Sequence, residues 1–142
     1  MRQVARQLQV NVGLAAADGD EMVYLESIRL GVRKSPRTIA SGQRLPMELT
    51  ALGRASLAVQ DETRRRSLLE QFQARRCASR WAELSEQIDA AMRTVESQGY
   101  CAASWQPQVV SIATPLDLPG YHGHALNISL STHEDIDRVS AR

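Results

Sequence analysis

The longest periodic pattern in the sequence runs from Trp81 to Val95, where apolar side chains recur every three or four residues. This spacing places those side chains on one face of an α-helix. Gly99 follows at the position where a left-handed residue commonly ends a helix. Strand-like sequence lies on both sides of this helix, so the order of elements predicts an α+β fold with a mostly antiparallel sheet flanked by helices.

Alternation of apolar residues marks the strands. Val12, Leu14 and Ala16 alternate with other residues before a turn at Asp18–Asp20, which predicts a β-hairpin. After Gly99, strand-like runs cover residues 100–106, 109–116 and 124–130, and a turn rich in proline and glycine joins the last two. Residues 29–44 hold turn formers and cations, so we expect a loop there with a short strand near Ile39.

Two shorter helices are expected between the hairpin and the long helix. Residues 48–59 place Leu52, Ala55 and Val59 on one apolar stripe, and Asp61 has the character of an N-cap for the helix after it. At the end of the chain, Thr132 is expected to cap a further helix.

Composition bounds the class of protein. A chain of 142 residues fits one domain, and Lys+Arg 17 against Asp+Glu 16 leaves a formal net charge of +1, which gives no reason to expect nucleic acid or an acidic membrane as partner. We interpret the clusters at Arg64–Arg66 and Arg75–Arg76 as solvated helix faces. Cys77 and Cys101 form no CxxC pair, and no run resembles a membrane span or a signal peptide, which favours the cytoplasm.

Sequence signatures of catalysis are absent. The chain has no G-x-S-x-G, H-E-x-x-H, G-x-G-x-x-G or P-loop pattern. His122 and His124 form an H-x-H in a turn, but His133 is the only other histidine, and a zinc site needs three or four ligands. We therefore predict no catalytic residue, no metal site and no cofactor.

Small side chains crowd the start of the helix at residues 48–59, directly after Pro46. Such a helix either packs densely on a sheet or forms the wall of a cavity. In the second interpretation, unpaired amides and the positive end of the helix dipole at Thr50 and Ala51 would receive a small carboxylate. Leu52 would then contact the apolar body of the ligand.

Hydroxyl groups on the last two strands are the second candidate. Ser129 and Ser131 are two residues apart, so they share one face of a strand with Asn127, and Ser111 lies on the preceding strand. These groups either bind the oxygens of a small acid or polar metabolite or form the solvated face of a half-exposed sheet. Trp105 is either partly exposed packing or a lid over an aromatic ligand.

Several blocks of sequence point to one family. GQRLPMELTALGRASLA, residues 42–58, follows the pattern G-x-[RK]-[LI]-P-[LM]-H-x-[TS]-[AG]-x-G-[KR]-A-x-L-A at all but one of its defined positions. LAAADGDEMVYLESI precedes it, and VESQGY, VVSIATPL and HALNISLST follow in order. Over nearly the whole chain, these blocks resemble the IclR family of bacterial transcription regulators. The resemblance implies a GAF-like effector-binding domain over residues 1–142, without the winged helix-turn-helix that precedes it in the family and with a truncated final helix.

The resemblance also implies a pocket, because the family positions that match Ser111, Ser129 and Ser131 line one. It thus favours an effector site, with Arg37 or Lys34 as a source of balancing charge for a small organic acid or aromatic acid. The residues expected to bind the effector are Thr50, Ala51, Leu52, Ser111, Asn127, Ser129 and Ser131.

Partners follow from the same resemblance. We expect a homo-oligomer, either dimer or tetramer, which contacts operator DNA only through the absent N-terminal domain and has no membrane partner. A GAF-like module of another signalling protein and a small unrecognised enzyme are the alternatives.

Three positions depart from the family pattern. Glu48 stands in place of a histidine, Ala103 falls near a common acid, and Val110 replaces an arginine. We therefore expect a pocket whose chemistry differs from that of relatives.

Overall fold

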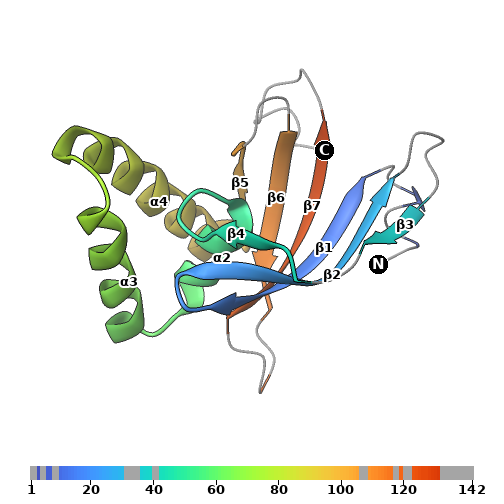
Figure 1. Cartoon of the computed structure of the whole chain (residues 1–142), viewed down its shortest axis with the longest axis horizontal. Helices are drawn as coiled ribbons and strands as arrows, with labels where there is room; N and C mark the ends of the chain where they lie inside the picture. The colour runs from blue at the N-terminus through green and yellow to red at the C-terminus, as the bar shows by residue number, and fades with distance from the viewer. Residues whose placement is uncertain are drawn as a thin grey trace.

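The structure, a computed structural model, describes residues 3, 6–7, 10–30, 36–39, 42–105, 109–116, 119 and 123–131. These residues form an antiparallel sheet with three helices on one side of it (Figure 1), which confirms the predicted α+β class. The expected helix after Thr132 lies outside the described residues.

The strands of the sheet follow the order β3-β2-β1-β7-β6-β5, with β4 paired to β2 off this path. All the pairings are antiparallel. The sequence predicts six of these strands and misses β4, which it treats as part of a loop. The strands are β1 (Asn11–Asp18), β2 (Glu21–Leu30), β3 (Pro36–Ile39), β4 (Arg44–Pro46), β5 (Cys101–Ala103), β6 (Val109–Pro115) and β7 (His124–Ser131).

Strand register decides which side chains face the helices. Val12 pairs with Ile28 on one side and Ile128 on the other, and these residues form a small apolar cluster. Because successive side chains alternate between faces, Asn11 and Gly13 lie on the opposite face. Helix α2 (Ala51–Val59) packs on this face of the sheet, the face that carries Asn11 and Gly13, which we call the inner face.

The start of α3 (Glu62–Ala74) and the end of α4 (Ala78–Gln98) lie at the cap residues that the sequence predicts, whereas α2 begins at Ala51 and not at the predicted Glu48. Helix α2 has Thr50 as its N-cap, and α3 has Asp61, whose side chain accepts a bond from the amide of Arg64. Helix α4 ends at Gly99, whose φ of 88° is the left-handed conformation expected of a C-cap glycine.

Helix α2 lies between the sheet and α4. Its small residues make this position tenable, since Ala51, Ala55 and Ser56 are buried with almost no exposed surface. The main core gathers around them from both sides, with Met22 and Ala15 from the sheet and Phe72 and Ile88 from the helices. The dense-packing interpretation of the small residues is therefore correct, and it does not exclude a cavity at the helix start.

The arginine clusters are fixed to neighbouring elements. Arg65 donates to the carbonyl oxygens of Leu57, Ala58 and Gln60, which satisfies acceptors at the C-terminal end of α2. Arg76 donates to the buried carboxylate of Glu48 at 3.0 Å. The interpretation as solvated helix faces is wrong for these two residues.

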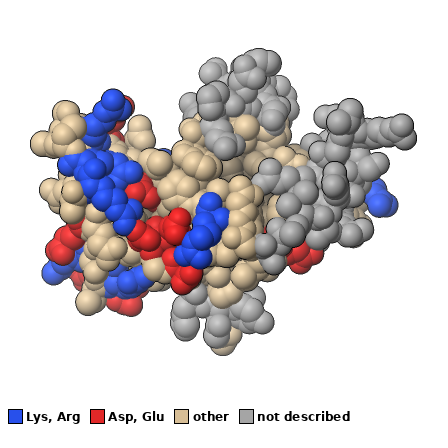
Figure 2. All heavy atoms as spheres, viewed as in Figure 1, with Lys and Arg blue, Asp and Glu red and all other residues tan. Residues whose placement is uncertain are grey.

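Arginine and carboxylate side chains are interspersed over the helical side of the face shown in Figure 2. This mixing agrees with the near-zero net charge of the chain. None of the described helices is both long enough and apolar enough to cross a membrane.

Candidate ligand-binding site

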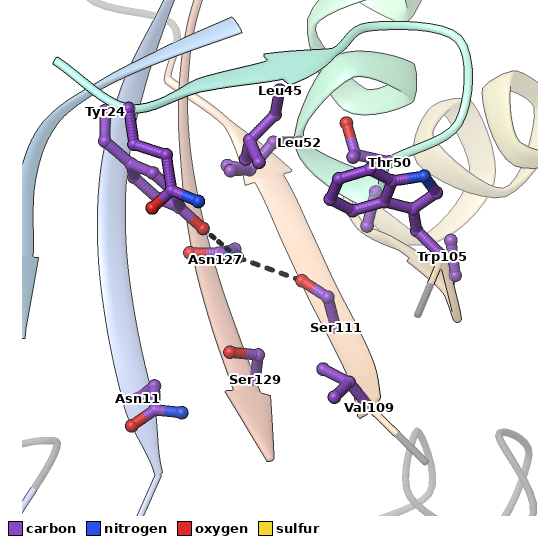
Figure 3. Close-up of a pocket in the computed structure, with 13 residues that line it drawn as sticks. Asn11, Tyr24, Leu45, Thr50, Leu52, Trp105, Val109, Ser111, Asn127 and Ser129 are labelled. Carbon is purple, nitrogen blue, oxygen red and sulfur yellow. Dashed lines mark hydrogen bonds between the residues drawn. The ribbon is translucent and has the colours of Figure 1, made fainter. Parts of the chain in front are cut away.

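A cavity of about 210 Å³ lies between the start of α2 and the inner face of the sheet (Figure 3). The structure brings six of the seven predicted residues to its wall: Thr50, Ala51, Leu52, Ser111, Asn127 and Ser129. The side chain of Ser131 lies outside the described residues, as do Lys34 and the side chain of Arg37. Further lining residues come from β1, β2, β4 and the residue before it, β5 and the segment after it, and β6: Asn11, Tyr24, Gln43, Leu45, Ala103, Trp105 and Val109.

The N-terminus of α2 supplies one wall. The Thr50 hydroxyl donates to the carbonyl of Pro46 at 2.8 Å and accepts from the amide of Gly53 at 3.2 Å, so it fixes the helix start. Within the described part of the chain, the backbone N–H groups of Ala51 and Leu52 donate to no protein acceptor. These amides belong to the first turn, where the partial positive charge of the helix is concentrated.

A hydrogen-bonded network on the sheet supplies the opposite wall. The side-chain nitrogen of Asn127 donates to Tyr24 Oη at 3.3 Å and to Ser111 Oγ at 3.0 Å. Figure 3 shows this network in the middle of the cavity, with Ser129 and Asn11 beyond it toward the end of β7. Asn127 and Tyr24 are buried, so the network is held in one arrangement by packing as well as by hydrogen bonds.

Gly13 makes room for this network. A Cβ atom at Gly13 would lie 2.4 Å from Cε1 of Tyr24 and 2.6 Å from Oδ1 of Asn127. These distances are far below van der Waals contact. The missing side chain of Gly13 is thus what permits Tyr24 and Asn127 to lie flat against β1.

No charged side chain is found among the described residues that line the cavity. Of the departures from the family pattern, Ala103 lies in the wall, whereas Glu48 does not. The Glu48 carboxylate is buried and pairs with Arg76 at 3.0 Å, away from the ligand space. The change at residue 48 therefore acts on packing between elements and leaves the lining uncharged.

Behind the α2 wall lie two further buried polar side chains. Arg54 donates to the carbonyl of Glu48 at 3.0 Å and to Gln87 at 3.3 Å, and burial lowers its pKa. The Cys101 thiol donates to the carbonyl of Ala51 at 3.4 Å, and burial raises its pKa to about 11. The thiol is therefore protonated at neutral pH and unsuited to act as a nucleophile.

Sequence reasoning missed the contribution of β1 and β2 to the wall. Asn11 and Gly13 alternate with the apolar Val12 and Leu14, and this polar half of the alternation was the available signal. Tyr24 carried no such signal, because a register shift between Leu14 and Ala15 changes which residues of β2 face inward.

Metal ligands do not gather in the described part of the chain, where no group of three or more His, Cys, Asp or Glu residues is arranged to hold an ion. His124 lies on β7, whereas His122 and His133 fall outside the described residues.

A curled antiparallel sheet that holds a small uncharged cavity under a helix N-terminus defines a small-molecule-binding domain of the GAF-like type. Residues 1–138 match the profile described as "Bacterial transcriptional regulator IclR C-terminal". The chain belongs to the IclR family and corresponds to its C-terminal effector-binding domain, which is part of a transcriptional regulator and not an enzyme.

Relatives agree with this assignment. The chain is 29% identical over 130 residues to the Pca regulon regulatory protein of Pseudomonas putida, covering 89% of this chain and 45% of that protein. An IclR family transcriptional regulator from Brucella abortus shares its fold with a TM-score of 0.82 at 30% identity, over 92% of this chain and 50% of the other. The chain thus spans about half the length of these relatives.

A more distant structure contains a ligand. A double mutant of the inducer-binding domain of the transcription factor PobR from Acinetobacter, in complex with 3-hydroxybenzoic acid, superposes with a TM-score of 0.72 at 22% identity. The match covers 99% of this chain and 83% of that one, and it shows a common fold.

Proposed function

We propose that this domain binds a small organic acid, such as an aromatic acid, in the cavity beneath α2, and that the bound state alters operator binding by a separate DNA-binding domain. The observation that carries the proposal is the cavity itself, which is uncharged and bounded by the free amides of a helix N-terminus and by hydroxyl groups of the sheet. A carboxylate suits such a place because both the amides and the helix dipole favour negative charge.

Cavity size and lining narrow the ligand class. A volume of about 210 Å³ is below the roughly 300–1,000 Å³ of sites for drug-sized ligands, so the ligand is a small metabolite. Leu45, Leu52 and Val109 provide apolar contact for its body. Trp105, 41% exposed, lies at the rim and offers a ring face on which an aromatic ligand can stack. The 3-hydroxybenzoic acid bound by the PobR domain supports this choice of class.

A thermal-shift screen with small carboxylates and aromatic acids tests the proposal. At about 100 times its dissociation constant, a ligand that binds only the folded state should stabilise it by roughly 2.7 kcal/mol. Ser129→Leu should fill the cavity and abolish this stabilisation, because Ser129 lies in its wall. Ser67→Leu, at an exposed position on α3, is the matched control and should leave it unchanged. If Ser129→Leu binds the ligand as well as the parent does, the ligand does not bind in this cavity.

Assembly and DNA binding are also proposals for the whole protein. A regulator of a two-fold operator needs at least two copies, so we propose a homo-oligomer that contacts DNA through its other domain alone. With a net charge of +1, the isolated domain should give no salt-dependent shift of duplex DNA. Sedimentation tests the homo-oligomer, and a monomer at high concentration would contradict it. A gel-shift titration tests DNA binding by the isolated domain, and a salt-sensitive DNA complex would contradict that prediction.

Two free cysteines fit a reducing cytoplasm, which cell fractionation can test.

A further inference from the structure

Asn127 fixes the direction in which two hydroxyl groups of the cavity donate. Both hydrogen bonds of its side chain, to Tyr24 Oη and to Ser111 Oγ, start from the same amide nitrogen. An amide NH₂ group carries two protons and accepts none, so each hydroxyl oxygen acts as acceptor toward Asn127. Each hydroxyl therefore keeps its own proton for another partner.

That partner is not found in the described protein. Neither Tyr24 Oη nor Ser111 Oγ donates to a second group among the described residues, and both residues line the cavity. The amides of Ala51 and Leu52 on the opposite wall are likewise donors without a protein acceptor there. The cavity thus presents hydrogen-bond donors from two walls and holds no cation among its described lining residues to balance a charge.

We propose that the site selects its ligand as a hydrogen-bond acceptor: it takes the ionised carboxylate of a small acid and rejects the uncharged amide of the same acid. Tyr24 and Ser111 are the specificity-determining residues, and Asn127 is the positioning residue that turns their protons toward the ligand. This inference rests on the proposed function, because it concerns the same cavity. It adds an explanation of how the site distinguishes a charged ligand from an uncharged one without a cationic side chain.

The physical reason is the asymmetry of hydrogen bonding. A carboxylate has only acceptors, so every donor in the cavity can be satisfied, and hydrogen bonds to a charged group are stronger than those between neutral groups. A carboxamide brings its own N–H groups against the hydroxyl protons and leaves buried donors unpaired, which costs affinity. Losing one such bond to a charged ligand corresponds to about a ten- to one-hundred-fold loss of affinity.

The experiment compares acids with their amides by titration calorimetry. The probes are benzoate and 3-hydroxybenzoate, each beside its uncharged benzamide. The parent domain should bind each acid at least about tenfold more tightly than its amide. Tyr24→Phe and Ser111→Ala should each weaken binding of the acid by about ten- to one-hundred-fold while changing binding of the amide little, so the preference for the acid over the amide decreases.

Two further variants separate specificity from structural damage. Ser56→Ala removes a fully buried hydroxyl that bonds to the carbonyl of Gly123, outside the cavity lining, and should leave the acid-to-amide ratio unchanged. Asn127→Asp replaces the donor with an acceptor and adds a negative charge beside the ligand, so the preference should invert; only Tyr24→Phe and Ser111→Ala, which change no charge, test the direction of the hydroxyl protons by themselves. Structural damage alone would weaken acid and amide together.

The outcomes distinguish the two proposals. Equal binding of acid and amide by the parent, or parallel loss of both in Tyr24→Phe and Ser111→Ala, overturns the selectivity inference and leaves the effector site standing. Failure of both acids to bind the parent contradicts the inference directly. If in addition no acid of the wider screen stabilises the domain, the proposed function fails as well.

Discussion

Replacing Gly53 with alanine should destabilise the domain by more than about 3 kcal/mol, although alanine is the better helix former by about 1 kcal/mol. Gly53 occupies the first turn of α2, where a Cβ atom would lie 1.9 Å from the carbonyl oxygen of Met47 and 2.4 Å from its Cα. Both are backbone atoms, so no side-chain rotation relieves the clash. The turn between β4 and α2 must move, and Thr50 with it.

Urea unfolding of the parent and the variant measures the effect. Gly19→Ala is the matched control, since Gly19 has a φ of +62° but nothing within 4 Å of a Cβ atom. That variant meets only backbone strain and should lose about 1–2 kcal/mol. If Gly53→Ala proved as stable as Gly19→Ala, the close approach of Met47 to α2 would not be required for folding.

Local signals explain the part of the fold that the sequence predicts correctly. The period of α4, the N-cap at Asp61 and the left-handed Gly99 depend on residues a few positions apart, and all three agree with the structure. Strand β4 has only three residues and is defined by pairing Leu45 with Met22, a contact that no local pattern records. The helix start, predicted at Glu48, moves to Ala51 because Thr50 takes the cap position.

The arginine clusters show a second limit of local reasoning. Charge runs with acidic neighbours are typical of solvated faces, yet Arg64 donates to the carbonyl of Gly19 and Arg75 pairs with Asp20 on the hairpin turn. These partners are more than forty residues away in the sequence, as the bonds from Arg64 and Arg75 record. Arg66, paired with Glu62 one helical turn away, and Arg75 are nevertheless exposed, as the pattern predicts.

The candidate site was predictable where it lies on continuous segments. The start of α2 and the alternating polar residues of β6 and β7 carry recognisable patterns, and their six described members do line one cavity. Tyr24 entered from the register of β2, which no local period records, whereas Trp105, considered from the sequence as packing or as a lid over an aromatic ligand, does line the cavity. That the cavity binds an effector stays a prediction.

Removing the charge of Arg76 should be the second most damaging change, with a loss of about 2–4 kcal/mol in Arg76→Met. Glu48 is only 3% exposed, and its carboxylate lies 3.0 Å from Arg76 and 3.7 Å from Arg75. Methionine preserves much of the aliphatic packing of arginine. It leaves the buried carboxylate of Glu48 paired only with Arg75, the more distant of the two arginines. Breaking such a pair from one side is costly because the remaining charge is no longer compensated.

A double variant separates the stranded charge from lost packing. In Glu48→Met/Arg76→Met both charges are absent, so the free energy of unfolding should return to within about 1 kcal/mol of the parent. Urea titrations of the two single variants and the double variant complete the cycle. If the double variant is as unstable as Arg76→Met, the loss comes from the packing of Arg76 and its bond to the Phe72 carbonyl, 3.1 Å away, and the buried charge is not its cause. Recovery in the double variant would instead show that Glu48, where the family signature has histidine, makes this arginine necessary.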